Sequence, residues 1–175
     1  MLFSKIIKKK FDAVLGRYDG EIGIRYCVPS DFPQLKSESF DIEGDRNILL
    51  KGYFYYYDKL VPEKLIVYDH GIGQGHYAYL KEIDYLAKHG YTVYAYDHTG
   101  CANTKGEGIL GFAQGVNDLD HVLNVINNDS RFKDVPRKIM GHSWGGYSCM
   151  NVAALHAEVS HVVFISWLLI SAFAN

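Results

Sequence analysis

The motif that constrains this chain most is Gly-x-Ser-x-Gly at residues 141–145. A short apolar run precedes it and a segment rich in small residues follows it, which predicts a strand, a tight turn and a helix. Glycines at Gly141 and Gly145 remove side chains that would obstruct such a turn. Ser143 would then stand at a helix N-terminus, where unpaired N–H groups favour negative charge. The motif predicts a nucleophile elbow, although small residues after a strand can also form an ordinary strand-to-helix turn.

Length and composition fit one folded domain, since the chain has 175 residues, of which 48% are hydrophobic and 22% charged. A net charge of -2 gives no electrostatic footprint for nucleic acid, so we expect no nucleic-acid partner. The cysteines Cys27, Cys101 and Cys149 show neither a disulfide framework nor zinc-ligand spacing. We therefore expect no metal, no cofactor and a reducing, cytoplasmic environment.

Residues 1–35 are interpreted as a lead-in to a domain at 36–175. Basic residues follow the apolar ones in residues 1–10, which is the wrong order for a signal peptide. A solvated helix is favoured there, with weak contact to an anionic membrane surface as the alternative. The apolar run at 162–174 is too short to span a bilayer, which needs about 20 residues.

The order of the remaining elements predicts an α/β fold. An antiparallel hairpin (37–43 and 47–57, with a turn at 44–46) comes first. Strands then alternate with amphipathic helices, which implies a mostly parallel sheet flanked by helices. The expected strands are 65–68, 91–96, 137–140 and 161–165, and the expected helices are about 79–88, 116–126 and 144–158.

Three loops follow the parallel strands: residues 69–76, residues 97–100 and the Ser143 turn. In such sheets the functional sites lie at the carboxyl ends of the strands, so these loops are expected to share one site. The first loop also imitates a dinucleotide-binding fingerprint, with Gly71 and Gly73 before a helix and Asp97 ending the next strand. His76 occupies the third glycine position, and a hairpin precedes the unit, so nucleotide binding is the weaker alternative.

These motifs, in this order and spacing, resemble the α/β-hydrolase superfamily, and within it the monoacylglycerol lipase and serine aminopeptidase group. The resemblance rests on residues 70–73, 97–100 and 141–146 and covers about 37–167. Residues 112–126 also resemble the family's helix before the elbow strand. One departure follows the second loop, where the family commonly has His, Gly and Ser and this chain has Cys101, Ala102 and Thr104.

The resemblance implies that Ser143 attacks the carbonyl of a small-molecule acyl substrate and forms an acyl-enzyme. A carboxylic ester, such as that of an acylglycerol, is the favoured substrate, with thioesters and amides as alternatives. Backbone N–H groups of Ile72 and Trp144 would form the oxyanion hole. Residues expected to support the motifs are His70, Gly71, Gly73, Asp97, His98, Gly141, His142 and Gly145.

A general base is missing from this scheme. In the superfamily an Asp or Glu and then a His follow the serine, but only His156, Glu158 and His161 do so here. His156 is expected roughly 20 Å along the helix that starts at the elbow, and His161 at the opposite end of the sheet. His70 and His98 lie at the correct edge but are expected to shape loops.

We therefore expect the front part of a hydrolase, C-terminally truncated, without the later strands and the lid. Such a chain would leave its last strand as an uncovered apolar edge and would have little or no turnover. A non-catalytic binding or interaction module on the same fold is the alternative from a different functional class.

Overall fold

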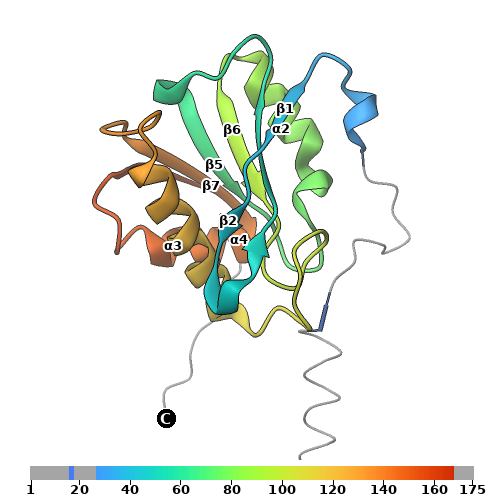
Figure 1. Cartoon of the computed structure of the whole chain (residues 1–175), viewed down its shortest axis with the longest axis vertical. Coiled ribbons are helices and arrows are strands. Elements are labelled where there is room, and N and C mark those ends of the chain that lie inside the picture. Colours follow the sequence, from blue (N-terminus) through green and yellow to red (C-terminus); the bar gives the residue numbers. More distant parts are fainter. Residues whose placement is uncertain (1–15, 18–26, 168–175) are drawn as a thin grey trace, which may run out of the picture.

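The computed structural model describes residues 16–17 and 27–167, so the basic N-terminal segment and the last eight residues lie outside the described residues. Six strands form one sheet in the order β1-β4-β6-β5-β7-β8, and β2 pairs with β3 separately (Figure 1). The strands are β1 Lys36–Ser39, β2 Ile42–Glu43, β3 Leu49–Leu50, β4 Gly52–Tyr56, β5 Leu65–Asp69, β6 Thr92–Tyr96, β7 Arg137–Ser143 and β8 Val159–Trp167. The helices are α2 Leu80–Lys88, α3 Phe112–Asn128 and α4 Trp144–Val152, with 3₁₀ turns at Pro29–Asp31, Asp45–Asn47, Pro62–Lys64 and His76–Tyr79.

The predicted hairpin is confirmed, but it is divided in two. β1 pairs antiparallel with β4, and β2 pairs antiparallel with β3. The break on the first arm falls at Asp41, whose carboxylate accepts a hydrogen bond from the Gly52 N–H on the other arm. The Asp41 side chain thus takes the place of a backbone acceptor on the neighbouring strand. The alternation of residue types in the sequence does not indicate this break.

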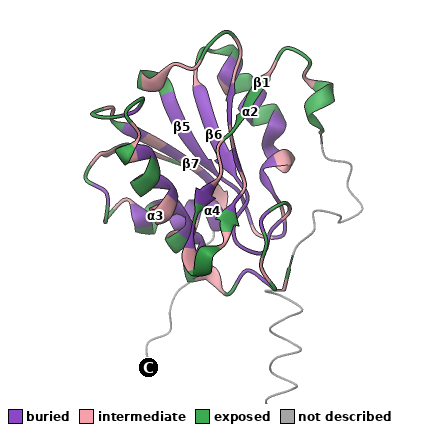
Figure 2. Cartoon of the chain, in the orientation of Figure 1, coloured by how far each residue is buried: buried purple, intermediate pink, exposed green. Residues whose placement is uncertain are grey.

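The mostly parallel sheet is also confirmed, since β6, β5, β7 and β8 run parallel and β4 runs antiparallel to β6. Every residue of β5 and of β6 is buried, as Figure 2 shows. Strands covered on both faces need apolar side chains at consecutive positions, which explains their unbroken hydrophobic runs.

Helices cover both faces of this sheet (Figure 1). On one face Leu80 and Ile83 of α2 pack with Tyr68, Val93 and Ala95. On the other, buried residues of α3 and α4 pack against alternate strand positions in a larger core that includes Leu119, Val122, Cys149, Val152, Val67, Tyr94 and Ile139. No helix of the described residues is both long and apolar enough for a membrane span.

The C-terminal elements differ from their predicted bounds. The predicted helix 144–158 ends at Val152, and the strands at 137–140 and 161–165 extend to Ser143 and over Val159–Trp167. The chain turns after Val152, and His156 is then buried between the carboxylates of Asp120 and Glu158. The contact with Asp120 is long-range, and no Gly or Pro in the sequence marks the turn. As expected, β8 lies at the edge of the sheet, where Val163 and Phe164 are 48% and 43% exposed.

Candidate active site

Ser143 stands at the junction of β7 and α4 with φ 53° and ψ -110°. A side chain rarely adopts positive φ, so this residue is strained, as residues at functional sites often are. Neither flanking glycine, Gly141 or Gly145, has positive φ, so Ser143 itself takes the unusual backbone conformation.

The two glycines serve close packing, in agreement with the prediction that a side chain at either position would obstruct the turn. A Cβ on Gly141 would lie 2.4 Å from the carbonyl carbon of Gly145, and a Cβ on Gly145 would lie 2.2 Å from the carbonyl oxygen of Asp69. No neighbour could yield easily, because all these atoms belong to the backbone. The N-terminus of α4 is thus held against the end of β5, which brings Ser143 beside the loop that follows Asp69.

That loop carries the predicted oxyanion donor Ile72. Gly73 has φ 74°, a conformation that favours glycine. The Gly71 N–H donates to the Tyr79 hydroxyl at 2.9 Å, and the same hydroxyl lies 2.7 Å from Nδ1 of His142. Among the residues that the structure describes, nothing accepts a hydrogen bond from the Ile72 N–H.

The second loop is organised around Asp97. One carboxylate oxygen accepts hydrogen bonds from the His76 N–H and from His76 Nδ1, each at 2.8 Å, and the other accepts from the Asn103 N–H at 3.1 Å. Burial raises the pKa of Asp97, but the hydrogen bonds and charge of His76 outweigh it and lower that pKa. Asp97 therefore holds loops together as a carboxylate.

The departure at Cys101, Ala102 and Thr104 is accommodated locally. The Thr104 hydroxyl donates to the Asp97 carbonyl at 2.7 Å and accepts from the Lys51 N–H at 2.8 Å. Ala102 takes φ 42°, and its carbonyl accepts from the guanidinium of Arg17. The loop thus keeps a hydroxyl-based anchor despite its unusual residues.

His98 is completely buried between the carboxylates of Asp69 and Asp118. Burial lowers the pKa of this imidazole, but the charge of Asp69 and the hydrogen bonds to both carboxylates raise it to about 10. Each ring nitrogen faces a carboxylate oxygen, and an ionised carboxylate can only accept a hydrogen bond, so these contacts favour the imidazolium and occupy both nitrogens. A protonated ring cannot accept a proton from Ser143.

His70 is equally buried, with Nδ1 2.8 Å from the Gly71 carbonyl oxygen and Nε2 accepting from the His98 N–H at 3.0 Å. Burial lowers the pKa of His70 to about 3, and repulsion from His98 adds to this effect. One ring nitrogen faces a backbone group of the first loop and the other faces a backbone group of the second loop, so His70 joins the two loops.

All eight histidines of the chain lie in the described residues, and none hydrogen-bonds the Ser143 hydroxyl. His156 follows α4 instead of lying on it, and its ring nitrogens are each 2.7 Å from a carboxylate oxygen, of Asp120 and of Glu158. His161 pairs with Lys138 at the end of β7 opposite Ser143. In the described part of the chain, no cluster of His, Cys, Asp or Glu could hold a metal ion.

Two residues of this network escaped the sequence analysis. Tyr79 was assigned only to the apolar face of a helix, and Asp118 was not singled out. Asp118 accepts from the Thr99 N–H at 2.8 Å and from its hydroxyl at 3.0 Å, in addition to contacting His98. Asp118 lies three residues after Gly115 and four residues before Val122, so it shares the face of α3 that carries the apolar residues. An acidic residue on that face was the signal that could have identified it.

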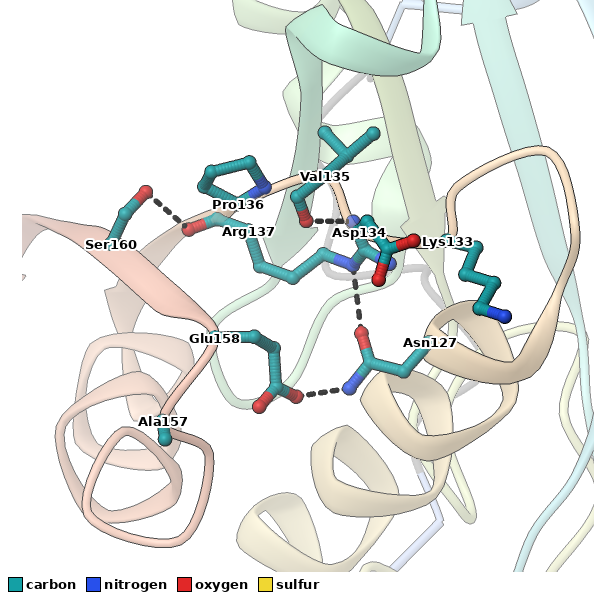
Figure 3. Close-up of a pocket in the computed structure, with 9 residues that line it drawn as sticks. All are labelled: Asn127, Lys133, Asp134, Val135, Pro136, Arg137, Ala157, Glu158 and Ser160. Atoms are coloured by element: carbon teal, nitrogen blue, oxygen red, sulfur yellow. Dashed lines mark hydrogen bonds between the residues drawn. The ribbon is translucent and has the colours of Figure 1, made fainter.

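A cavity of about 590 Å³ lies far from Ser143, at the amino-terminal ends of β7 and β8 (Figure 3). Arg137 donates to the Asn127 side chain at 2.8 Å and to the carbonyls of Phe132 and Val135. Asn127 in turn donates to Glu158. The polar groups that line this cavity thus largely satisfy one another.

Known proteins agree with this architecture. A family model described as serine aminopeptidase, S33, matches residues 61–171. The monoglyceride lipase of Saccharomyces cerevisiae is 26% identical over 134 residues, and that of Rattus norvegicus is 32% identical over 119 residues. These alignments cover 73% and 63% of this chain but 41% and 37% of the relatives. The chain therefore spans about two fifths of the length of the curated relatives it matches.

Solved structures show the same fold. An esterase of Pyrococcus furiosus superposes with a TM-score of 0.72 at 18% identity, over 87% of this chain and 58% of that chain. A carboxyl esterase of Bacillus coagulans gives a TM-score of 0.62 at 22% identity, over 73% of this chain and 43% of that one. The family match covers most of the chain and includes all three loops. This chain therefore belongs to the serine aminopeptidase S33 family of α/β-hydrolases.

Proposed function

We propose that the chain carries the nucleophile and the oxyanion-binding half of a serine hydrolase that cleaves carboxylic esters. The observation that carries the proposal is the strained Ser143, held by Gly145 against the strand end from which the Ile72 loop departs. Relatives named monoglyceride lipases favour acylglycerols as the substrate class.

In the proposed reaction the Ser143 Oγ attacks the ester carbonyl and loses its proton to a base. The carbonyl oxygen becomes an oxyanion between the N–H groups of Ile72 and Trp144. Collapse of this intermediate expels the alcohol and leaves an acyl-enzyme, which water hydrolyses. The helix N-terminus at Trp144 adds a favourable dipole for the developing negative charge.

We further propose that this chain alone turns over slowly or not at all. Each histidine already contacts another group, and the two buried rings in the loops at this edge of the sheet, His70 and His98, have pKa values of about 3 and about 10. Neither value suits a general base at neutral pH. Loss of triad partners typically lowers the rate by a factor on the order of 10⁴ or more.

A fluorophosphonate probe, read by intact mass spectrometry, tests both parts. We expect slow labelling of Ser143 that accelerates with pH, because hydroxide then replaces the absent base. Ser143→Ala should abolish it, whereas Ser160→Ala, which changes a serine at the far end of the sheet, should not. Labelling as fast as that of complete esterases would refute the predicted inactivity, and no labelling at any pH would refute the nucleophile.

The alternatives predict other results. A binding or interaction module would stay soluble and monodisperse without reacting with the probe. Nucleotide binding requires a free acidic side chain for the ribose, but His76 and Asn103 occupy both carboxylate oxygens of Asp97. A rise in melting temperature with NAD or ATP would nevertheless favour that alternative.

A further inference from the structure

The peptide units on both sides of Gly71 are fixed by side chains. The Gly71 N–H donates to the Tyr79 hydroxyl at 2.9 Å, and its carbonyl oxygen lies 2.8 Å from Nδ1 of His70. A Cβ on Gly71 would approach Nδ1 of His142 and the Tyr79 hydroxyl to 2.9 Å each. A side chain at position 71 would therefore force the Tyr79 hydroxyl and the His142 ring to shift.

These contacts determine the tautomer of His70. Nε2 lies 3.0 Å from the backbone N–H of His98, which can only donate, so Nε2 carries no proton. The Gly71 carbonyl oxygen can only accept, so Nδ1 must carry the proton. The ring is thus neutral and donates to Gly71, which agrees with its burial and low pKa.

The Gly71 carbonyl belongs to the same peptide unit as the Ile72 N–H. A trans peptide is planar, and its C=O and N–H point in opposite directions, so holding the oxygen also aims the N–H. A hydrogen bond to the oxygen also strengthens the N–H as a donor.

We propose that His70 is a positioning residue that aims the Ile72 N–H at the oxyanion formed on Ser143. This inference rests on the proposed hydrolase function. The ring of His98, held between Asp69 and Asp118, in turn fixes the backbone N–H that selects the tautomer. The cluster of His98, Asp69 and Asp118 thereby helps to orient the Ile72 N–H without contacting substrate.

The first test measures the tautomer in the unmodified 175-residue chain. Long-range ¹H–¹⁵N spectra of the histidine rings should show His70 protonated at Nδ1 and bare at Nε2 from pH 5 to pH 8. A proton on Nε2, or titration of His70 within this range, would overturn the proposal. No variant has to fold for this measurement.

The second test compares two variants. His70→Asn keeps an amide nitrogen at the same number of bonds from Cα as Nδ1, whereas His70→Leu keeps the bulk and removes the donor. The Ile72 amide proton shift should stay close to that of the unmodified chain in the Asn variant and move in the Leu variant. The amide shift of Ser160, at the opposite end of the sheet, should remain unchanged in both, and equal Ile72 shifts in the two variants would refute the proposal.

Reactivity gives a third measurement. Phosphonylation of Ser143 at pH 9 should fall by about 10²–10³-fold in His70→Leu, the usual effect of losing one oxyanion donor, and by less than about tenfold in His70→Asn. Equal losses in both variants would again count against aiming by His70. If Ser143 of the unmodified chain does not react, the hydrolase function fails, and the tautomer and amide shifts still decide whether His70 orients the Ile72 N–H.

Discussion

Adjacent glycines at the start of α4 offer a matched test of the packing that places Ser143. Gly145 and Gly146 both lie inside the helix, and neither has positive φ. Alanine at either position should gain roughly 1 kcal/mol from helix propensity. The two sites differ in surroundings, because a Cβ on Gly145 would lie 2.2 Å from the Asp69 carbonyl oxygen and one on Gly146 would lie 3.4 Å from that of Gly141.

The expected free energies of unfolding follow from these distances. A contact of 2.2 Å against backbone forces a shift of more than 1 Å, at the upper end of the usual overpacking cost of about 1–3 kcal/mol. Set against the helix gain, Gly145→Ala should destabilise the chain by about 2 kcal/mol. Gly146→Ala should stabilise it by about 0.5–1 kcal/mol, because its contact needs little adjustment.

Urea denaturation followed by circular dichroism measures both values, and thermal melting gives a second reading. At about 2–4 °C per kcal/mol, Gly145→Ala should melt about 4–8 °C below the unmodified chain, and Gly146→Ala slightly above it. A Gly145→Ala variant as stable as Gly146→Ala would refute the inferred contact between α4 and the end of β5. The position of Ser143 beside the Ile72 loop would then need another cause.

Three further predictions concern the loops around the site. Tyr79→Phe should destabilise the chain by about 1–3 kcal/mol in urea because it leaves the buried Gly71 N–H without an acceptor, whereas Tyr85→Phe, at a residue 61% exposed, should change stability by less than about 0.5 kcal/mol. Thr104→Val should cost about 2 kcal/mol through its two lost hydrogen bonds, and Thr104→Ser, which keeps the hydroxyl, should cost clearly less. The pKa of His70 is lowered from 6.5 to about 3, so its contribution to stability is complete above pH 6.5 and is lost as the pH falls toward 3. The free energy of unfolding of the unmodified chain should therefore fall more steeply from pH 6.5 to pH 4 than that of His70→Asn, by up to about 1.4 kcal/mol per pH unit, and parallel curves would contradict the assignment.

The sequence predicted the sheet well because its physical causes are local. Unbroken apolar runs mark β5 and β6, and the glycines of the elbow mark a junction that only small residues can form. The end of α4 was not predictable in this way. It depends on His156 reaching Asp120, which lies 36 positions earlier in the chain.

The candidate site likewise has features that the sequence predicts and features that depend on contacts across the fold. Sequence order alone brought His70, His98 and Ser143 to one edge of the sheet. Their protonation states depend on contacts that cross the fold, such as the pairing of His98 with Asp118 on α3. Nothing in the sequence near His98 distinguishes a buried imidazolium from a candidate base, because the positions of Asp69 and Asp118 together decide between them.

These contacts separate two requirements of a serine hydrolase. The groups that hold the loop of Ile72 and its neighbour are His70, His98, Asp118 and Tyr79, and all precede Ser143 in the chain. The same contacts occupy the rings of His70 and His98, so these two histidines hold the loops in place and are not free to exchange protons with Ser143. Stabilising an oxyanion requires donors fixed in advance, whereas activating Ser143 requires a ring free to gain and lose a proton near neutral pH. In the proposed site, His70 and His98 serve the first requirement, and the contacts that hold their rings leave neither of them free for the second.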